Sequence, residues 1–325
     1  MAYSVGWSCP ADGDECDMED REMDVLPTKI LLATDASPDA ALAARAALDI
    51  ARGAGSELHV VHVWRTLPSA RFGAYIRREL SREAGRLLDE QVEKIEAAGG
   101  GVSGKHLREG PKADEILDLA GQLGADLIVI GTRGQGAVGR LLLGSVAEGI
   151  VYHARCPILV VRGGDPAWPP ARVVVGDDGS EGARAAARLA FGIGKLFEAD
   201  LLLVRSYPKQ PEIDDEAAVL DAGSAVGEAV AEEEQGRDER ALKERVAGLE
   251  QDTGLRPEVS TSFGNPAEAV LAAADSGGDG GERSLVAVGH RGLGTLGRMR
   301  LGSVSTKVLR AARGPVLIHP YVQGS

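Results

Sequence analysis

Residues Ile130–Val146 read IGTRGQGAVGRLLLGSV, and this stretch indicates how the chain folds. An apolar run ends at Gly131, several glycines follow, and Gly144-Ser145 opens another apolar segment. We interpret it as a strand, a glycine loop and the N-terminus of a helix. Glycines let backbone N–H groups approach an anion closely, and a helix N-terminus adds unpaired donors and a positive dipole end. The stretch therefore predicts an anion site, with Ser145 as helix N-cap or hydroxyl donor.

The same stretch returns late in the chain, where Val288–Val304 reads VGHRGLGTLGRMRLGSV. The matching positions are Gly131, Gly134, Gly144 and Ser145 in the first copy and Gly289, Gly292, Gly302 and Ser303 in the second. One glycine pattern is weak evidence, but two at equal spacing, each after an apolar run, indicate a duplicated binding unit.

The composition narrows the class of protein. The chain has 325 residues, 44% of them hydrophobic, which is enough for roughly two domains with real cores. A net charge of -13 argues against nucleic acid or an anionic membrane as the main partner. We find no membrane-length apolar run and no secretory signal pattern, and the cysteines make no disulfide framework. We therefore expect a cytoplasmic protein.

Strands and helices alternate through two repeats. In the first repeat we expect strands at 30–33, 58–64, 102–107, 127–130 and 157–161, and in the second at 172–175, 200–207, 258–263, 284–288 and 315–319. The helices expected between them are 39–53, 74–98, 113–123 and one through 154, then 183–197, about 216–249 and 267–274. This alternation predicts an α/β fold of two tandem doubly wound domains, each a five-stranded parallel sheet with helices on both faces.

The expected domain boundaries follow from composition. Residues 1–27 form an acidic tail that we expect to be disordered. Domain 1 covers 28–163, a proline-rich linker covers 164–170, and domain 2 covers 171–320. The apolar last strands, 157–161 and 315–319, could pair across a homodimer interface or with each other inside one chain.

Each repeat carries an acid at the end of its first strand, Asp35 or Asp178. Ligands of open α/β sheets bind at the carboxyl ends of the strands, so this acid and the glycine loop after strand four can face one crevice. The acid could accept hydrogen bonds from ribose or hold a metal beside phosphates. The alternative is a helix cap, because Asp-x-Ser precedes a helix in both copies.

Other motifs carry less weight. The glycines also match G-x-G-x-x-G, but they follow the fourth strand rather than the first, which disfavours a nicotinamide or flavin role. A P-loop is excluded because no Gly-Lys-Ser/Thr occurs. His59 and His62 lie on opposite faces of one strand, the histidines show no ligand-like spacing, and Cys156 is expected in the core. Arginines within the two loops suit phosphate or are plain surface residues; they are Arg133, Arg140, Arg291, Arg298 and Arg300.

Together these residues resemble the tandem universal stress proteins. Both copies match that family's Gly-x2-Gly-x9-Gly-Ser/Thr motif, and Asp178-Gly179-Ser180 matches its Asp-Gly-Ser after strand one. The first copy, Asp35-Ala36-Ser37, departs at the middle residue. The resemblance covers about 29–162 and 172–320, and it implies two ATP sites.

The resemblance also implies which residues bind ATP. Site 1 would use Ala33, Thr34, Asp35, Val63, Ile130, Gly131, Arg133, Gly134, Gly144, Ser145 and Val146. Site 2 would use Asp177, Asp178, Ser206, Val288, Gly289, Arg291, Gly292, Gly302, Ser303 and Val304. Asp177 replaces Thr34, so two adjacent acids could repel the nucleotide there or recruit a divalent ion, whereas Ser206 for Val63 matters little if the contact is main-chain.

These expectations leave three functions open. The first is an ATP-binding, nucleotide-dependent regulator of stress response without catalytic residues, because no general base is evident. The second is a slow ATP hydrolase or phosphotransferase with Mg2+ on Asp35 or Asp178. The third is an interaction module with vestigial nucleotide sites.

Overall fold

The fold is described from a computed structural model, which covers residues 25–65, 73–132, 143–162, 167–207, 225–278, 280–290 and 301–320. The first half contains β1 (Lys29–Ala33), α1 (Pro38–Ala54), β2 (Glu57–Trp64), α2 (Gly73–Ala97), β3 (Gly104–Glu109), α3 (Lys112–Leu123), β4 (Leu127–Gly131), α4 (Ser145–His153) and β5 (Ile158–Val161). The second half contains β6 (Arg172–Gly176), α5 (Glu181–Leu196), β7 (Asp200–Tyr207), α7 (Ala225–Thr253), β8 (Glu258–Phe263), α8 (Pro266–Asp275), β9 (Ser284–Gly289), α9 (Ser303–Ala311) and β10 (Val316–His319).

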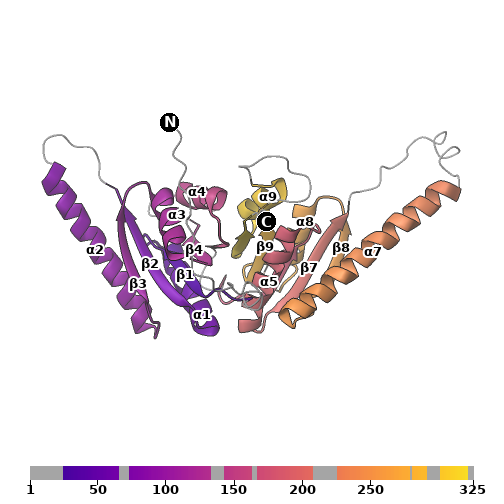
Figure 1. The fold of residues 1–325 in the computed structure, drawn as a ribbon, viewed down its shortest axis with the longest axis horizontal. Coiled ribbons are helices and arrows are strands. Elements are labelled where there is room, and N and C mark those ends of the chain that lie inside the picture. Colours follow the sequence, from indigo (N-terminus) through magenta and orange to yellow (C-terminus); the bar gives the residue numbers. More distant parts are fainter. Residues whose placement is uncertain are drawn as a thin grey trace, which may run out of the picture.

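The strands form one ten-stranded sheet in the order β3-β2-β1-β4-β5-β10-β9-β6-β7-β8. Within each half every pairing is parallel, which confirms the predicted pair of five-stranded parallel sheets. At the centre β5 and β10 pair antiparallel, with Val316 opposite Val160 and Ile318 opposite Ile158. The last strands therefore pair inside the chain, and the two halves share one continuous sheet (Figure 1).

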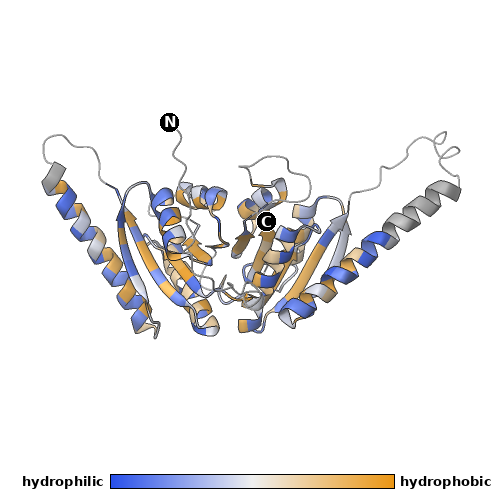
Figure 2. Cartoon of the chain, in the orientation of Figure 1, coloured by the Kyte–Doolittle hydropathy of each residue, from blue (hydrophilic) through white to orange (hydrophobic). Residues whose placement is uncertain are grey.

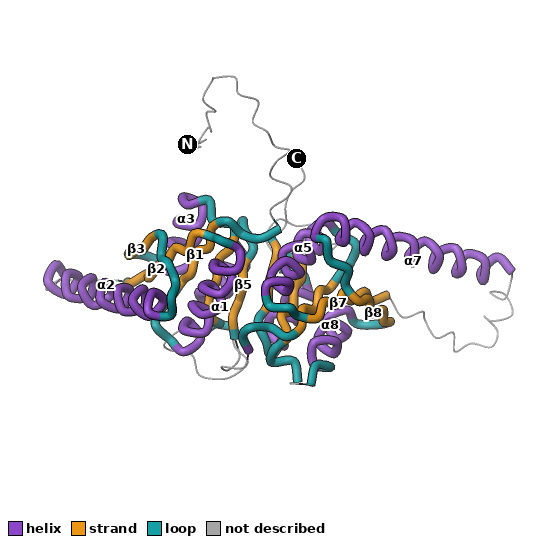
Figure 3. Tube along the Cα trace, turned by 90° about the horizontal axis from the view of Figure 1, so that it is seen from below, coloured by secondary structure: helices purple, strands orange, loops and turns teal. Residues whose placement is uncertain are grey.

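Helices cover both faces of this sheet. Helices α1, α2, α5 and α7 pack on one face, and α3, α4, α8 and α9 pack on the other. Each of the two apolar cores contains residues of both halves. Figure 2 shows the apolar colour along the central strands and the polar colour on the outer helix faces, as expected for helices that bury one side. In Figure 3 the long helices α2 and α7 lie at the two opposite ends of the molecule.

The linker contributes to the join between the halves. Trp168 is only 1% exposed and belongs to the core shared by α1 and α5. Its indole Nε1–H donates to Asp49 Oδ2 at 3.1 Å, and its ring meets Phe197 edge-on with centroids 5.2 Å apart. The described end of the linker is thus an anchor between the first half and the second.

Some boundaries differ from the predictions. Strand β3 runs Gly104–Glu109 rather than 102–107, because pairing with β2 up to Trp64 sets its end rather than apolar character. Helix α7 is described from Ala225, so the predicted part before it lies outside the described residues, as does the acidic tail up to residue 24. None of the described helices is long and apolar enough to cross a membrane.

Candidate functional site

The turn after the first strand of each half has one design. Ser37 Oγ accepts a hydrogen bond from Ala40 N at 3.2 Å and caps α1, and Ser180 Oγ caps α5 in the same way through Ala183 N. The helix caps are therefore the serines, not the aspartates before them. In each half one aspartate oxygen instead holds the turn; the bonds are Ser37 N to Asp35 Oδ1 at 3.1 Å and Ser180 N to Asp178 Oδ1 at 3.0 Å.

The middle residue of this turn is left-handed in both halves. Ala36 has φ 61° and Gly179 has φ 85°. Glycine adopts this conformation without strain, whereas a Cβ makes it costly. The departure of Ala36 from the family pattern therefore stores strain in the first half that Gly179 avoids in the second.

The two ends of each glycine loop meet. Gly144 N donates to Thr132 O at 2.9 Å, and Gly302 N donates to His290 O at 2.8 Å. Helices α4 and α9 then begin at Ser145 and Ser303. The residues inside the loops, 133–142 and 291–300, lie outside the described residues, and with them Arg133, Gly134, Arg140, Arg291, Gly292, Arg298 and Arg300.

The N-cap position of α4 and α9 is a glycine, so the expectation of Ser145 as N-cap is wrong by one residue. Gly144 and Gly302 have extended dihedral angles, φ -67° with ψ 148° and φ -60° with ψ 156°, and neither helix start has a side-chain cap. The first N–H groups of such a helix are available to an external acceptor. Since neither φ is positive, backbone conformation does not require glycine here.

Gly131 and Gly289 have a different reason to be glycine. A Cβ at residue 131 would lie 2.7 Å from the backbone carbon of Asp39, and one at residue 289 would lie 3.0 Å from that of Gly182. The end of the fourth strand thus packs directly against the first turn of α1 or α5. This close packing brings the aspartate turn beside the start of the glycine loop.

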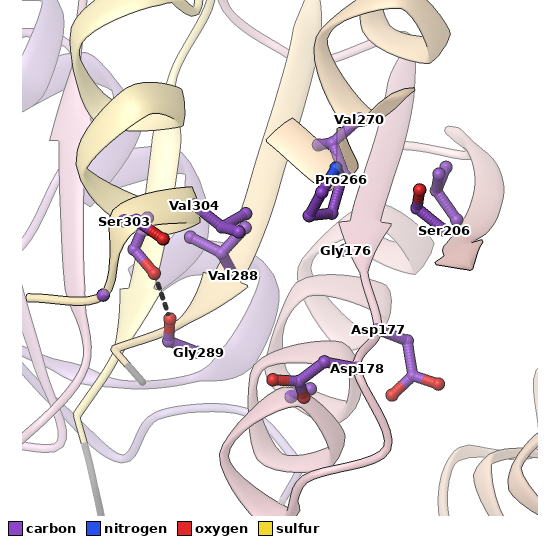
Figure 4. A pocket seen from close by; sticks show the side chains of 14 residues that line it. Gly176, Asp177, Asp178, Ser206, Pro266, Val270, Val288, Gly289, Ser303 and Val304 are labelled. Carbon is purple, nitrogen blue, oxygen red and sulfur yellow. Dashed lines mark hydrogen bonds between the residues drawn. The ribbon is translucent and has the colours of Figure 1, made fainter. Parts of the chain in front are cut away.

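In the second half these segments enclose a pocket of about 370 Å³ (Figure 4). Its lining includes the predicted residues Asp177, Asp178, Ser206, Val288, Gly289, Gly302, Ser303 and Val304. It also includes residues that the sequence did not single out: Gly176, Ala183, Val204, Pro266, Val270 and Ser305. The pocket opens at the carboxyl ends of β6, β7 and β9, where an open parallel sheet binds its ligands.

The described site 1 residues occupy corresponding places. Ala33, Ile130 and Gly131 stand at the ends of the paired strands β1 and β4, and Val63 lies near the end of β2. Thr34 and Asp35 follow β1, while Ser145 and Val146 open α4 after Gly144. The structure therefore brings the described members of each predicted set to the carboxyl edge of its half.

Asp177 behaves differently from the prediction of a repelling or metal-recruiting acid. Its side chain is 1% exposed, and it forms ion pairs with Arg205 and with Arg245, whose Nε lies 3.5 Å from Asp177 Oδ1. Gly179 N also donates to Oδ1, at 3.3 Å. Because two guanidinium groups compensate this carboxylate, Asp177 adds no free negative charge to the pocket. In Figure 4 the carboxylate of Asp178 points toward the side of Gly289, and that of Asp177 points the other way.

The sequence is similar to those of known proteins. The model of the universal stress protein family matches residues 27–162 and 170–320. A universal stress protein of Mycobacterium tuberculosis is 34% identical over 201 residues, which are 60% of this chain and 61% of that protein. One from Mycolicibacterium smegmatis is 30% identical over 251 residues, 74% of this chain and 78% of the relative.

A solved structure shares the fold along nearly the whole chain. The crystal structure of a universal stress protein from Archaeoglobus fulgidus has a TM-score of 0.61 and 24% identity, covering 90% of this chain and 98% of that one. With both halves matched by one family model, the chain belongs to the universal stress protein family.

Proposed function

We propose that the chain is an ATP-binding stress-response regulator with one nucleotide site in each half. The observation that carries the proposal is the pocket of the second half, which gathers Asp178, Gly289, Gly302 and Ser303 from three separate segments. An uncapped helix start offers N–H donors and a positive dipole end to phosphates. The apolar residues Val204, Val270 and Val288 offer a surface for a base.

The assigned roles follow from position. Asp178 and Asp35 would accept hydrogen bonds from ribose or hold Mg2+ beside the phosphates. Gly144-Ser145 and Gly302-Ser303 would hold the phosphates, together with the loop residues Arg133, Gly134, Arg291 and Gly292. We also propose that the protein is cytoplasmic. Its two domains would span residues 28–163 and 171–320. Because β5 and β10 pair within the chain, we propose that the two halves make with each other the contact that a homodimer would make through these strands.

The test uses Gly144→Asp and Gly302→Asp, singly and together. Both positions have negative φ, and aspartate is a good N-cap, so we expect the fold to persist. The new carboxylate would occupy the anion position. Like charges about 4 Å apart cost about 4 kcal/mol at an effective dielectric of 20, or roughly 1000-fold in affinity. Each single variant should lose one ATP site by calorimetry, and the double variant should lose both.

The matched control is Gly121→Asp with Gly278→Asp, since both glycines are exposed with nothing within 4 Å of an added Cβ. These variants add the same charges away from the pockets and should bind ATP normally. Equal ATP affinity in the Gly144→Asp/Gly302→Asp protein and this control would refute the site assignment. Absence of ATP binding by the unaltered protein would leave the interaction module as the function.

Phosphate release separates the regulator from a slow hydrolase. If the protein is a regulator, bound ATP should stay intact over hours in the presence of Mg2+. The mass of the nucleotide released on denaturation of the protein shows whether it is still ATP. Release of phosphate that disappears in Asp35→Asn/Asp178→Asn would favour the Mg-dependent hydrolase or phosphotransferase.

A further inference from the structure

Two histidines from different strands meet on the face of the sheet that α3 covers. His59 lies in β2 and His106 in the edge strand β3, whose register places His106 beside Val61. His59 Nδ1 and His106 Nε2 are 3.1 Å apart, and the ring centroids are 5.3 Å apart. This pair belongs to neither nucleotide site, since it lies toward the start of β2 rather than at its carboxyl end.

A glycine keeps the space beside these nitrogens open. Gly104 stands opposite His59 in the β2–β3 ladder. A Cβ there would lie 2.5 Å from His59 Nδ1 and 2.9 Å from His106 Nε2. Any other residue at 104 would therefore place its Cβ against both ring nitrogens, and glycine leaves that space open.

The outer nitrogen of His59 is held by an acid. Glu57 Oε2 lies 3.4 Å from His59 Nε2, and Lys29 Nζ lies 3.5 Å from the same oxygen. A carboxylate that accepts from Nε2–H leaves the lone pair of His59 on Nδ1, facing His106. Histidines that bind metals commonly have such a partner on their other nitrogen.

We propose that His59 Nδ1 and His106 Nε2 bind one divalent transition-metal ion, Zn2+, Ni2+ or Cu2+, in the space left by Gly104. An ion about 2.05 Å from both nitrogens would see them at an angle of about 98°, which lies between octahedral and tetrahedral geometry. Imidazole ligands suit these ions, with Cu2+ favoured. In the part of the chain that the structure describes, no group of three or more His, Cys, Asp or Glu side chains could hold a metal. Water therefore completes the coordination, and the site is of modest affinity.

The protons balance without a further reactant. Without metal, one nitrogen of the facing pair must carry a proton, and with His59 held as its Nε2–H tautomer this proton is on His106 Nε2. On binding, His106 moves its proton to Nδ1 through water, so both facing lone pairs go to the ion.

The second half offers an internal control. Leu202 stands beside Val174 where His59 stands beside Leu31, and Ser260 stands beside Val204 where His106 stands beside Val61. The second half thus has neither ligand at these positions. The variant His59→Leu/His106→Ser copies its residues into the first half and preserves residue types that this fold already accepts there.

The experiment titrates Zn2+, Ni2+ or Cu2+ into the full chain carrying Cys9→Ser, Cys16→Ser and Cys156→Ser, so that thiols do not compete. We expect His59→Leu/His106→Ser to bind one equivalent fewer than this background by calorimetry. Glu57→Gln should weaken the site about 10-fold through the outer partner. His153→Gln, which removes a histidine whose Nδ1 bonds the Gly149 carbonyl in α4, is the matched control and should change nothing.

Two further measurements keep the inference falsifiable if the double variant folds poorly. Gly104→Ala retains both histidines but fills the space, and it should lose the metal. In the background protein, the nitrogen NMR signals of the imidazole rings should shift on addition of Zn2+ at Nδ1 of His59 and at Nε2 of His106. Equal stoichiometry and affinity in all variants, or Zn2+ signals confined to other histidines, would mean that the pair is only a hydrogen bond.

Discussion

The two halves of the molecule share the turn and the helix start beside the expected ligand and differ in the residue that directly follows the first strand. Both have the aspartate turn, the closed glycine loop and an uncapped helix start. The residue directly after the first strand, however, is Thr34 in the first half and the buried acid Asp177 in the second.

The neighbours of these residues changed in a compensating way. In the first half His62 Nδ1–H donates to Thr34 O at 2.8 Å. In the second half the residue at the place of His62 is Arg205, and Arg245 reaches Asp177 from α7. Arg245 Nη2 also donates to Ser180 O at 3.0 Å. A histidine–carbonyl hydrogen bond and an ionic triad thus support the same turn, so each set should be exchangeable only as a whole.

The largest effect is expected from Asp177→Ala. It leaves Arg205 and Arg245, whose side chains are only 11% and 9% exposed, without the carboxylate between them. Removing one partner of a buried ionic group costs about 3–5 kcal/mol. Urea unfolding of the variant should show this loss of unfolding free energy.

Two variants make the Asp177 prediction specific. Asp177→Thr/Arg205→His/Arg245→Gln copies the first half and should recover most of the loss. Gln91 is taken as the counterpart of Arg245, because it is buried and precedes the core residue Val92 on α2 as Arg245 precedes Val246 on α7. Asp252→Ala also removes an acid between two arginines, Arg184 at 2.7 Å and Arg188 at 3.8 Å, but at a more exposed place. It should cost about 1 kcal/mol or less. A triple variant no more stable than Asp177→Ala would contradict the compensation.

A smaller difference is expected between Gly131→Ala and Gly289→Ala. The added Cβ would meet backbone atoms of α1 at 2.7 Å in the first half and of α5 at 3.0 Å in the second. Backbone cannot move aside cheaply, so we expect a loss of about 1–3 kcal/mol for Gly131→Ala and less for Gly289→Ala. Gly121→Ala, in open space on α3, is the control and should not destabilise. Equal melting temperatures of the two variants would show that the halves are packed alike.

Much of this architecture could be predicted because it repeats along the sequence. Alternating apolar runs and helices predicted the five strands of each half and their parallel pairing, and the carboxyl ends of parallel strands must meet at one edge. For this reason Asp178, Gly289 and Gly302, which are distant in sequence, line one pocket. Their role in binding ATP stays a prediction.

What escaped prediction depends on contacts between distant elements. Arg205 was visible as a charge within an apolar strand, but its carboxylate partner and Arg245 on α7 meet only in the fold. His59 and His106 are likewise far apart in sequence, and only the β2–β3 register brings them together. The one-residue error at Ser145 has a local cause, since a cap is set by the dihedral angles of Gly144 rather than by residue type alone.

The smallest effect is expected from exchanging the middle residues of the two turns. Ala36→Gly removes the strain of a Cβ at φ 61° but adds freedom to the unfolded chain, so the net gain should stay below about 1 kcal/mol. Gly179→Ala puts a Cβ at φ 85° and should lose about 1 kcal/mol or more. The double exchange moves the strained turn from one half to the other, and its unfolding free energy should lie close to that of the unaltered protein. A loss in Ala36→Gly would instead mean that the Ala36 methyl group makes contacts that outweigh its strain, and that the two turns differ in packing as well as in conformation.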